Sequence, residues 1–552
     1  GGPAVDLGTL DSEGKEDPVG MTVPFALPGS RDGEPGEVRF SIRTIGRRAG
    51  TTAQEESRER LQLIARSQSY RRRSWRGRAP FLTIPGVRTG GELTEYELTL
   101  LNWGDDDASG WLEIEVEQPP QPGVEVVFNE PDCEGCPDPA GGLRDAIVEA
   151  IQSARRSIDL AINGIDDDVL IEARCNPAED GVEVRVVTDD ESLDPEDSRS
   201  YYEWLFDPET GLAGCGIDLD VVAANGLMHH KFYLIDAGTD APVLITGSTN
   251  QTTAGLEVNH NHMVFIRGSE EVMDAFGGEF DQFWRHCASD WLDDRGGRCN
   301  ECTPGCIEDR SEEGPWSVGD TTVEVLFSPA DDPLRVLRGA TERRRLLEPD
   351  PACNGEDAAC ACRPSGAAWM CDYCAVGEDG FGLLEQAEER VLVSMYSATD
   401  QCFALGLARA HARGVTTLVV WDRVRAGSPY ERDDYLCSMG VPVLLSIWND
   451  RSAQARNHNK LLVIDDVVFD GSMNLSASGS DMNNESTIIL RGQRIADQLA
   501  AYVEQEAALL EALGAEIRDA ETCRCSDLLD NDGDGLADGA DDDCDAGEIN
   551  DR

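Results

Sequence analysis

The chain has 552 residues, with 106 Asp and Glu against 47 Lys and Arg, and a formal charge of −59. This length exceeds one ordinary domain and predicts three or four folded units. So negative a charge repels polyanions over long range and disfavours non-specific binding to nucleic acid, although a local basic pocket is compatible with it. The sequence holds no run of 18 apolar residues, so it predicts no transmembrane helix.

The first region, residues 1–117, is predicted to form a small β-sandwich. Apolar and polar residues alternate over 97–100 and 112–116, a pattern typical of strands. Within the same region, residues 39–78 hold 12 Arg against three Glu. This Arg-rich segment either pairs with the acidic surface of the same protein or binds anionic lipid or another polyanion. A stiff, Pro-rich linker follows at 118–123.

Two blocks of matching pattern come next, at 124–290 and 322–513. Apolar runs that alternate with helices indicate an α/β layered fold in each block. The predicted strands and helices of the first block cover 124–128, 143–154, 157–162, 182–187, 217–222 and 270–285. Those of the second block cover 323–327, a helix through 384–388, 391–395, 415–420, 441–446 and 494–513.

Cysteine-rich loops separate and interrupt the two blocks. Residues 291–321 are a Cys-rich linker, and 346–376 are a Cys-rich insertion in the second block. The 18 Cys favour disulfides and an oxidising compartment, so we expect a secreted, periplasmic or cell-surface protein. Zinc is the alternative for pairs such as Cys133 and Cys136, which have ligand-like spacing. The start at Gly1, without a signal peptide, is typical of a processed form.

The tail, residues 523–552, is acidic and contains a calcium-loop pattern. Oxygen ligands fall at positions 1, 3, 5, 9 and 12 and glycine at position 6, as in an EF-hand loop, although position 12 usually holds Glu. The predicted ligands are Asp530, Asp532, Asp534, Asp538 and Asp541. We expect either a structural calcium site, with Cys525 and Cys544 closing the loop, or a solvated acidic tail.

Each block contains one copy of the same motif, His-x-Lys-x4-Asp followed by Gly-Ser-x-Asn. The motif residues are His229, Lys231, Asp236 and Asn250 in the first copy and His458, Lys460, Asp465 and Asn474 in the second. The two histidines are 229 residues apart, which indicates an internal duplication of a domain-sized unit. The chain has 44 Arg but only three Lys, and two of these occupy equivalent motif positions. Such positions require a compact ammonium, as a narrow pocket for a phosphate oxygen would.

The motif chemistry suits a phosphate held between two strands. Residues i and i+2 of a strand share one face, so each His-x-Lys presents both side chains together. A neutral imidazole can attack phosphorus while a protonated one donates to the leaving oxygen. Two ammoniums and the motif asparagines would neutralise the remaining oxygens, so no metal cofactor is required for catalysis. A cation at either motif histidine would be repelled by the neighbouring lysine.

These paired motifs resemble those of the phospholipase D superfamily over residues 124–513. The local sequence at 228–232 is similar to that of its bacterial, nuclease-like branch. The resemblance implies two lobes with one active site between them, within one chain. It also implies phosphodiester cleavage through a covalent phosphohistidine, with His229 as nucleophile and His458 as general acid and base. In the family pattern Glu485 is placed to orient His458, whereas the equivalent position in the first block holds Asn261.

Three functions are compatible with these observations. The net negative charge of the chain favours a phosphodiesterase that acts on phospholipid at a membrane surface. The sequence of the first motif at 228–232 favours an endonuclease of the same superfamily. The third is an inactive scaffold that binds phosphate or surfaces. Hydrolysis and transfer of the phosphatidyl group are alternatives for the first. Of three further histidines, His230, His260 and His262, the last two share one strand face near the first motif and are predicted either to line the cleft or to form a polar pocket wall.

Overall fold

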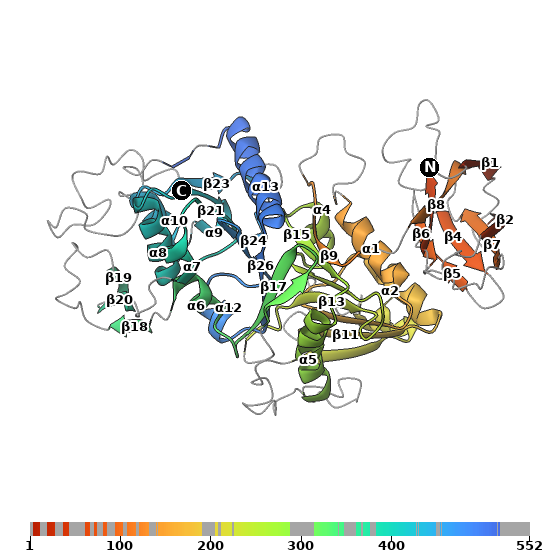
Figure 1. The fold of residues 1–552 in the computed structure, drawn as a ribbon, viewed down its shortest axis with the longest axis horizontal. Coiled ribbons are helices and arrows are strands. Elements are labelled where there is room, and N and C mark those ends of the chain that lie inside the picture. The colour runs from red at the N-terminus through yellow and green to blue at the C-terminus, as the bar shows by residue number, and fades with distance from the viewer. Residues whose placement is uncertain are drawn as a thin grey trace.

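A computed structural model describes the backbone of strands within 4–117 and 342–375, and side chains over most of 121–339 and 382–518 (Figure 1). The longer gaps are 132–139, 190–204 and 287–313. The predicted calcium loop and the Cys525–Cys544 pair lie outside the described residues. Within those residues, no helix combines the length and apolarity needed to cross a bilayer.

The N-terminal strands form two four-stranded antiparallel sheets, with orders β1-β8-β3-β6 and β2-β7-β4-β5. They are β1 (Ala4–Leu10), β2 (Val19–Leu27), β3 (Glu37–Arg43), β4 (Leu61–Arg66), β5 (Arg71–Arg73), β6 (Phe81–Ile84), β7 (Thr94–Asn102) and β8 (Ala108–Glu117). The strands predicted over 97–100 and 112–116 fall within β7 and β8. The packing of the two sheets into a sandwich remains a prediction, as does the role of the Arg-rich segment.

The first lobe is a seven-stranded mixed sheet with the order β12-β11-β10-β13-β14-β15-β9. Its strands are β9 (Gly123–Phe128), β10 (Ser157–Ile162), β11 (Glu183–Asp189), β12 (Asp218–Val222), β13 (Lys231–Ile235), β14 (Val243–Gly247) and β15 (His262–Arg267). Its helices are α1 (Leu143–Ser153), α2 (Asp168–Glu179), the short α4 (Thr253–Glu257) and α5 (Glu270–His286). The predicted elements are all present, and α2 is an additional helix.

The second lobe repeats this arrangement in an eight-stranded sheet, β16-β17-β26-β25-β24-β21-β22-β23. Its strands are β16 (Trp316–Val318), β17 (Thr321–Ser328), β21 (Arg390–Met395), β22 (Thr416–Asp422), β23 (Val443–Ser446), β24 (Lys460–Ile464), β25 (Val467–Gly471) and β26 (Glu485–Arg491). Its helices are α6 (Pro333–Arg338), α7 (Gly382–Gln386), α8 (Gln401–Ala412), α9 (Arg423–Ala426), α10 (Asp433–Ser438), α12 (Ala477–Asp481) and α13 (Gln493–Ala512). The predicted internal duplication of an α/β unit is therefore confirmed.

The Cys-rich insertion and the strand just before it form a small separate sheet. It comprises β18 (Glu342–Leu346), β19 (Cys360–Ser365) and β20 (Ala368–Ala375), with β20 in the centre.

A shared apolar core holds the two lobes together. One buried cluster combines residues of β15 and α5 from the first lobe with residues of β17, β26 and α13 from the second. Phe276 of α5 packs edge-on against Phe327 of β17, with ring centroids 5.0 Å apart. The lobes lie side by side, and both α5 and α13 lie near their junction (Figure 1). Because apolar burial is the main source of folding free energy, this shared core stabilises the association of the two lobes.

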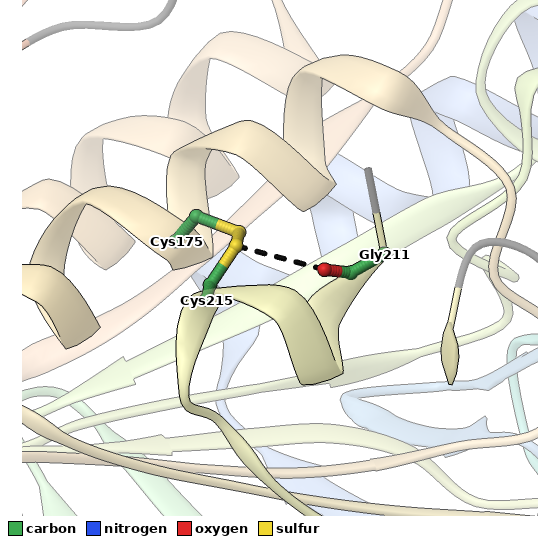
Figure 2. The surroundings of a disulfide bond; sticks show 3 residues. All are labelled: Cys175, Gly211 and Cys215. Carbon is green, nitrogen blue, oxygen red and sulfur yellow. Dashed lines mark hydrogen bonds between the residues drawn. A yellow bond between two sulfur atoms is a disulfide. The ribbon is translucent and has the colours of Figure 1, made fainter. Parts of the chain in front are cut away.

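A disulfide fixes α2 to the turn that precedes β12. Cys175 of α2 is bonded to Cys215 of a short 3₁₀ helix (Leu212–Cys215), and Cys215 Sγ lies 3.6 Å from the carbonyl oxygen of Gly211 (Figure 2). Cys402 and Cys437 in the second lobe are also disulfide-bonded.

Replacing both Cys175 and Cys215 by serine should lower the free energy of unfolding by about 4 kcal/mol, because the bond closes a loop of 40 residues in the unfolded chain. Urea unfolding of the double variant and the parent, both without reductant, measures this difference. Equal midpoints would contradict it.

Thiol titration of the denatured, unreduced parent should find few free thiols, as expected for a protein whose cysteines are mostly paired.

Candidate active site

Backbone hydrogen bonds connect each motif to the opposite lobe. The amide of His229 donates to the carbonyl of Asn484, at 2.9 Å, immediately before β26. The amide of His458 donates to the carbonyl of His260, at 3.0 Å, immediately before β15. The two motifs therefore meet at one interlobe site, which confirms the prediction that the halves of the site come together.

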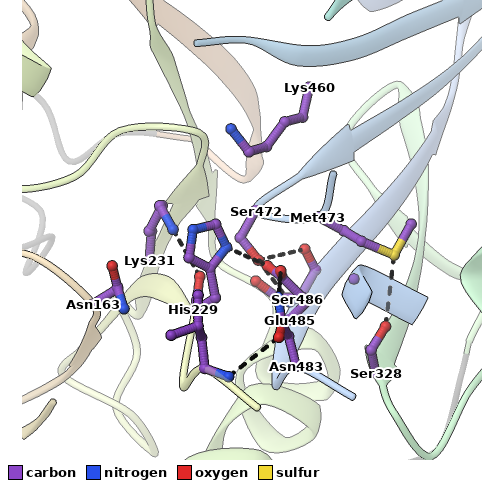
Figure 3. Close-up of polar contacts among 12 residues, drawn as sticks. Asn163, His229, Lys231, Ser328, Lys460, Ser472, Met473, Asn483, Glu485 and Ser486 are labelled. Atoms are coloured by element: carbon purple, nitrogen blue, oxygen red, sulfur yellow. Dashed lines mark hydrogen bonds and ion pairs between the residues drawn. The ribbon is translucent and has the colours of Figure 1, made fainter. Parts of the chain in front are cut away.

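The two motif histidines exchange partners across the interface. His229 Nδ1 lies 2.8 Å from Glu485 Oε2 of the second lobe (Figure 3). His458 Nδ1 lies 3.0 Å from Asn261 Oδ1 of the first lobe. The prediction that Glu485 orients His458 is therefore wrong. The physical cause of the exchange is the packing of the lobes. It turns the residues at the start of β15 and of its counterpart β26 toward the motif of the other lobe rather than their own.

Glu485 is held as a carboxylate. It accepts hydrogen bonds from the Ser472 hydroxyl, at 2.7 Å, and from Asn483 Nδ2, at 3.1 Å. Burial favours its neutral form, but the interaction with His229, the charge of Lys231 and the hydrogen bond from Ser472 outweigh burial and hold the pKa of Glu485 below its ordinary value. The carboxylate can therefore accept the Nδ1–H of His229 and stabilise positive charge on that ring.

His229 itself is a neutral imidazole near pH 7. Burial lowers its pKa, Glu485 opposes this, and the charges of Lys231 and Lys460 lower it further, so the net pKa of His229 is below its ordinary value. With Nδ1–H donated to Glu485, the lone pair is on Nε2. This is the tautomer that a nucleophilic histidine requires.

His458 differs from His229 because its partner is an amide. Asn261 Nδ2 donates to the carbonyl of Gly255, at 2.8 Å, so Asn261 Oδ1 faces His458 and accepts its Nδ1–H. Burial, then the charges of Lys460 and Lys231, hold the pKa of His458 well below its ordinary value. A bound phosphate anion would oppose both ammonium charges and so favour protonation of this ring.

The two motif lysines supply buried positive charge beside the histidines. Each donates to the carbonyl of its own motif histidine, Lys231 Nζ to His229 O at 2.8 Å and Lys460 Nζ to His458 O at 2.9 Å. Burial lowers the pKa of Lys231 to about 8 and holds that of Lys460 well below its ordinary value. Both side chains extend toward the His229 ring (Figure 3). An anion between them would offset the cost of burying two like charges.

The Gly-Ser-x-Asn segments have a distinct role for each residue. A Cβ on Gly471 would lie 2.1 Å from the carbonyl oxygen of Ser486, so only glycine allows β25 and β26 to approach this closely. The serine that follows, Ser472, binds Glu485. The amide oxygens of Asn250 and Asn474 are buried and have no hydrogen-bond partner among the described residues. Buried polar atoms are rarely left unpaired, so these amides are available to a ligand.

Asp236 and Asp465 are not part of this site, and their predicted catalytic role is corrected to a structural one. Each lies at the end of its motif strand opposite the lysine, with φ of 55° and 52°. Asp236 accepts from the backbone amides of residues 155–157, and Asp465 from those of residues 388–390, at 2.7–3.3 Å. These carboxylates anchor the loop that starts β10 or β21 and thereby fix the strand beside the motif.

Of the three further histidines, His262 has the most informative contacts. Its Nδ1 lies 2.8 Å from Asn459 Oδ1 and its Nε2 lies 2.8 Å from Asp470 Oδ2, both in the other lobe. Asn459 Nδ2 is bonded elsewhere, to the Tyr502 hydroxyl among others, so both partners of His262 are acceptors. Both ring nitrogens must therefore carry hydrogen, and His262 is an imidazolium buried against a carboxylate across the lobe interface.

The other two are also buried and engaged. His230 Nε2 lies 3.0 Å from Glu279 Oε1, and His260 stacks on Trp448 with ring centroids 4.1 Å apart. Of the two alternatives for His260 and His262, these contacts favour the polar wall.

Replacing His262 by Gln should cost about 3–5 kcal/mol of stability at pH 6, because Asp470 then loses its charge partner in a buried site. Burial lowers the pKa of His262, but Asp470 and Asn459 outweigh burial and the opposing charge of Lys460, so its folded pKa is raised. The stabilisation is therefore complete below the unfolded value of about 6.5 and is lost as the pH rises through the folded value. Unfolding free energies between pH 6 and 9 should show the difference between variant and parent shrinking with pH.

The matched control is Ser486→Ala. Ser486 lies 3.4 Å from Thr246 at the equivalent place in the repeat, where the pair is uncharged. Its small cost should not change with pH, and a cost for His262→Gln that is equally flat would rule out the charged pair.

Tyr396 is a site residue that the reading of the sequence missed. Its ring centroid lies 4.9 Å from that of His458 and 5.3 Å from Lys460 Nζ. It follows β21 directly, where the first lobe has Asn163 after β10. The only sequence signal was therefore an aromatic residue at a position where the repeat differs.

A family model described as "Cardiolipin synthase, PLD-like domain" matches residues 147–284 and 381–507, one segment in each lobe and each with one motif. Each lobe therefore matches a phospholipase D-like domain, as the resemblance and the duplication in the sequence indicated.

Among curated relatives, the human mitochondrial cardiolipin hydrolase is 34% identical over 155 residues, 27% of this chain and 56% of that protein. A phospholipase D of Rickettsia conorii is 29% identical over 135 residues, 24% of this chain and 61% of that protein. The chain spans about half the length of the curated relatives it matches.

Two solved structures are also similar. Nuc of Salmonella typhimurium, a phospholipase D family member, has a TM-score of 0.25 at 22% identity, over 30% of this chain and 95% of that one. The phosphatidylserine synthase of Haemophilus influenzae has a TM-score of 0.46 at 13% identity, over 72% of this chain and 87% of that one.

Proposed function

We propose that this phospholipase D-like protein is a phosphodiesterase that works through a phosphohistidine. The observation that carries the proposal is the crossed pairing of the two histidines, His229 with a carboxylate and His458 with an amide, beside two buried lysines. This pairing gives the histidines different proton affinities, and a two-step displacement needs that difference.

In the first step, Nε2 of His229 attacks phosphorus and the bond to the leaving oxygen breaks. His458, protonated in the substrate complex, gives its proton to that oxygen. In the second step a water attacks phosphorus, His458 takes a proton from the water, and the phosphorus–nitrogen bond breaks to restore His229. Glu485 stabilises the positive charge of the phosphorylated ring, and Lys231, Lys460 and the motif asparagines stabilise the phosphoryl oxygens. Each step balances without a metal cofactor.

Phospholipid is the proposed substrate class. Curated relatives are named as a cardiolipin hydrolase and a phospholipase D, and a chain of charge −59 disfavours polyanionic nucleic acid. The second candidate is an endonuclease, which the sequence Met-His-His-Lys-Phe at residues 228–232 favours. An inactive phosphate-binding scaffold is less compatible with two complete motifs.

The surroundings of the enzyme are also part of the proposal. The Cys175–Cys215 disulfide is consistent with an oxidising compartment such as the cell surface. The Arg-rich segment 39–78 would bind anionic lipid surfaces, and the tail at Asp530–Asp541 would bind a structural calcium ion.

The test is incubation of the protein with phospholipid vesicles and with plasmid DNA, both in EDTA. Release of a head group or of phosphatidic acid supports the phospholipase, nicking of the plasmid supports the endonuclease, and neither product would support the scaffold. Activity that disappears in EDTA would contradict the metal-free mechanism.

A further inference from the structure

A polar cavity opens beside the active site in the second lobe. Its volume is about 390 Å³, within the range of sites that bind small molecules. Three segments form it: the loop after β21, residues 425–432 from α9 to the start of α10, and residues 474–483 from the end of β25 to just past α12. Asn474 of the motif and Asn483, which binds Glu485, both line it, so the cavity adjoins the phosphate site.

The lining is rich in groups that pair with hydroxyls. Six hydroxyl-bearing side chains and two amides contribute, among them Thr399 and Ser478. The amide oxygen of Asn474 is buried without a hydrogen-bond partner among the described residues. A hydroxyl can donate or accept, so it can satisfy such an amide in either orientation. An acyl chain would leave all of these groups unpaired, which is costly.

The charge of the lining is positive, in contrast to the chain as a whole. Arg425 and Arg432 both contribute, and the Arg425 guanidinium lies over the Tyr396 ring, 5.2 Å from its centroid. Tyr396 in turn contacts His458 and Lys460. The one lining carboxylate, Glu431, accepts from the Ser397 hydroxyl at 2.5 Å and from the amide of Ala398 at 2.8 Å. Glu431 Oε1 also lies 3.7 Å from Arg425 Nε, so this carboxylate is engaged with the loop after β21 and with one of the two guanidiniums, and the lining keeps a net positive charge.

We propose that this cavity is a subsite for a polyol head group, of the glycerol class, on the phosphate held between the two lysines. The proposal rests on the proposed phosphodiesterase function, because that phosphate places the head group. A quaternary ammonium such as choline would face two guanidiniums and offer no hydrogen bonds to the hydroxyls and amides. The cavity thus selects the alcohol attached to the phosphate, whereas the motifs act on the phosphate itself.

The test compares binding of sn-glycerol 3-phosphate and phosphocholine by calorimetry. Both ligands carry the same phosphate monoester, so their ratio of dissociation constants reports the head group alone. The parent protein should bind glycerol 3-phosphate at least about tenfold tighter. In Arg425→Gln, and independently in Ser478→Asp at the exposed end of α12, the ratio should fall toward one. Arg409→Gln, at a half-exposed position on α8, should keep the parent ratio.

A parent ratio near one, or a ratio unchanged in both pocket variants, would overturn the subsite. Loss of folding or of the phosphate site lowers affinity for both ligands and leaves the ratio unaltered, so it is not mistaken for the predicted effect. Binding needs no turnover. A protein that prefers glycerol 3-phosphate but cleaves no diester would therefore refute the proposed reaction and not the pocket, and an active enzyme without the preference would refute the pocket alone.

Discussion

His229→Gln should reduce turnover of bis(4-nitrophenyl) phosphate by at least about 10⁴-fold, the scale expected when a nucleophile is removed. Gln fills a similar volume and can still donate to Glu485, so the site should stay folded. Its amide cannot attack phosphorus, and no covalent intermediate can form. Steady-state release of nitrophenol measures the effect, and unfolding curves of parent and variant show whether the fold is retained.

His458→Gln provides the matched comparison, because it removes the other half of the proposed proton transfer. Nitrophenolate leaves without protonation, so this variant should still release about one equivalent of nitrophenol in a burst, and then stall because no base activates the water. A phosphorylated His229 should be recoverable under alkaline quench. A burst in His229→Gln instead, with none in His458→Gln, would reverse the two roles.

Lys460→Arg should lose on the order of 100-fold in turnover, equivalent to about 2.7 kcal/mol of barrier. Lys460 Nζ is buried, donates to His458 O at 2.9 Å and lies against the Tyr396 ring. Arg keeps the charge, but its planar fork needs more room and has a different donor geometry, so it displaces the phosphate. Catalysis falls steeply with such small displacements. Turnover at saturating substrate is the measurement.

Lys231→Arg should behave like Lys460→Arg, since the two lysines make equivalent contacts in the two lobes. Lys15→Arg, far from both motifs in the sequence, should leave turnover unchanged. If both motif variants match the parent, the compact ammonium is not required and the inference from the three lysines of the chain fails.

The sequence by itself determined the duplicated α/β lobes and the residues that carry the phosphate site. Both follow from local pattern. Apolar runs specify buried strands wherever they occur, and a motif that appears twice identifies equivalent positions without any knowledge of packing. The order of elements from β9 to α5 and from β17 to α13 was therefore predictable, and so was the position of Lys231 and Lys460 beside the histidines.

Only the tertiary structure decided which groups face one another. Glu485 and Asn261 occupy equivalent places in the repeat, and the sequence cannot say whether each serves its own lobe or the other. Asp236 resembles a catalytic carboxylate until its backbone partners are seen. The roles of Tyr396, Arg425 and Asp470, which pairs with His262, depend on contacts with residues that are tens to hundreds of positions away in the sequence. The physical reason is that hydrogen bonds and charges act over a few ångströms in space, and the packing of two lobes across an apolar interface sets those distances.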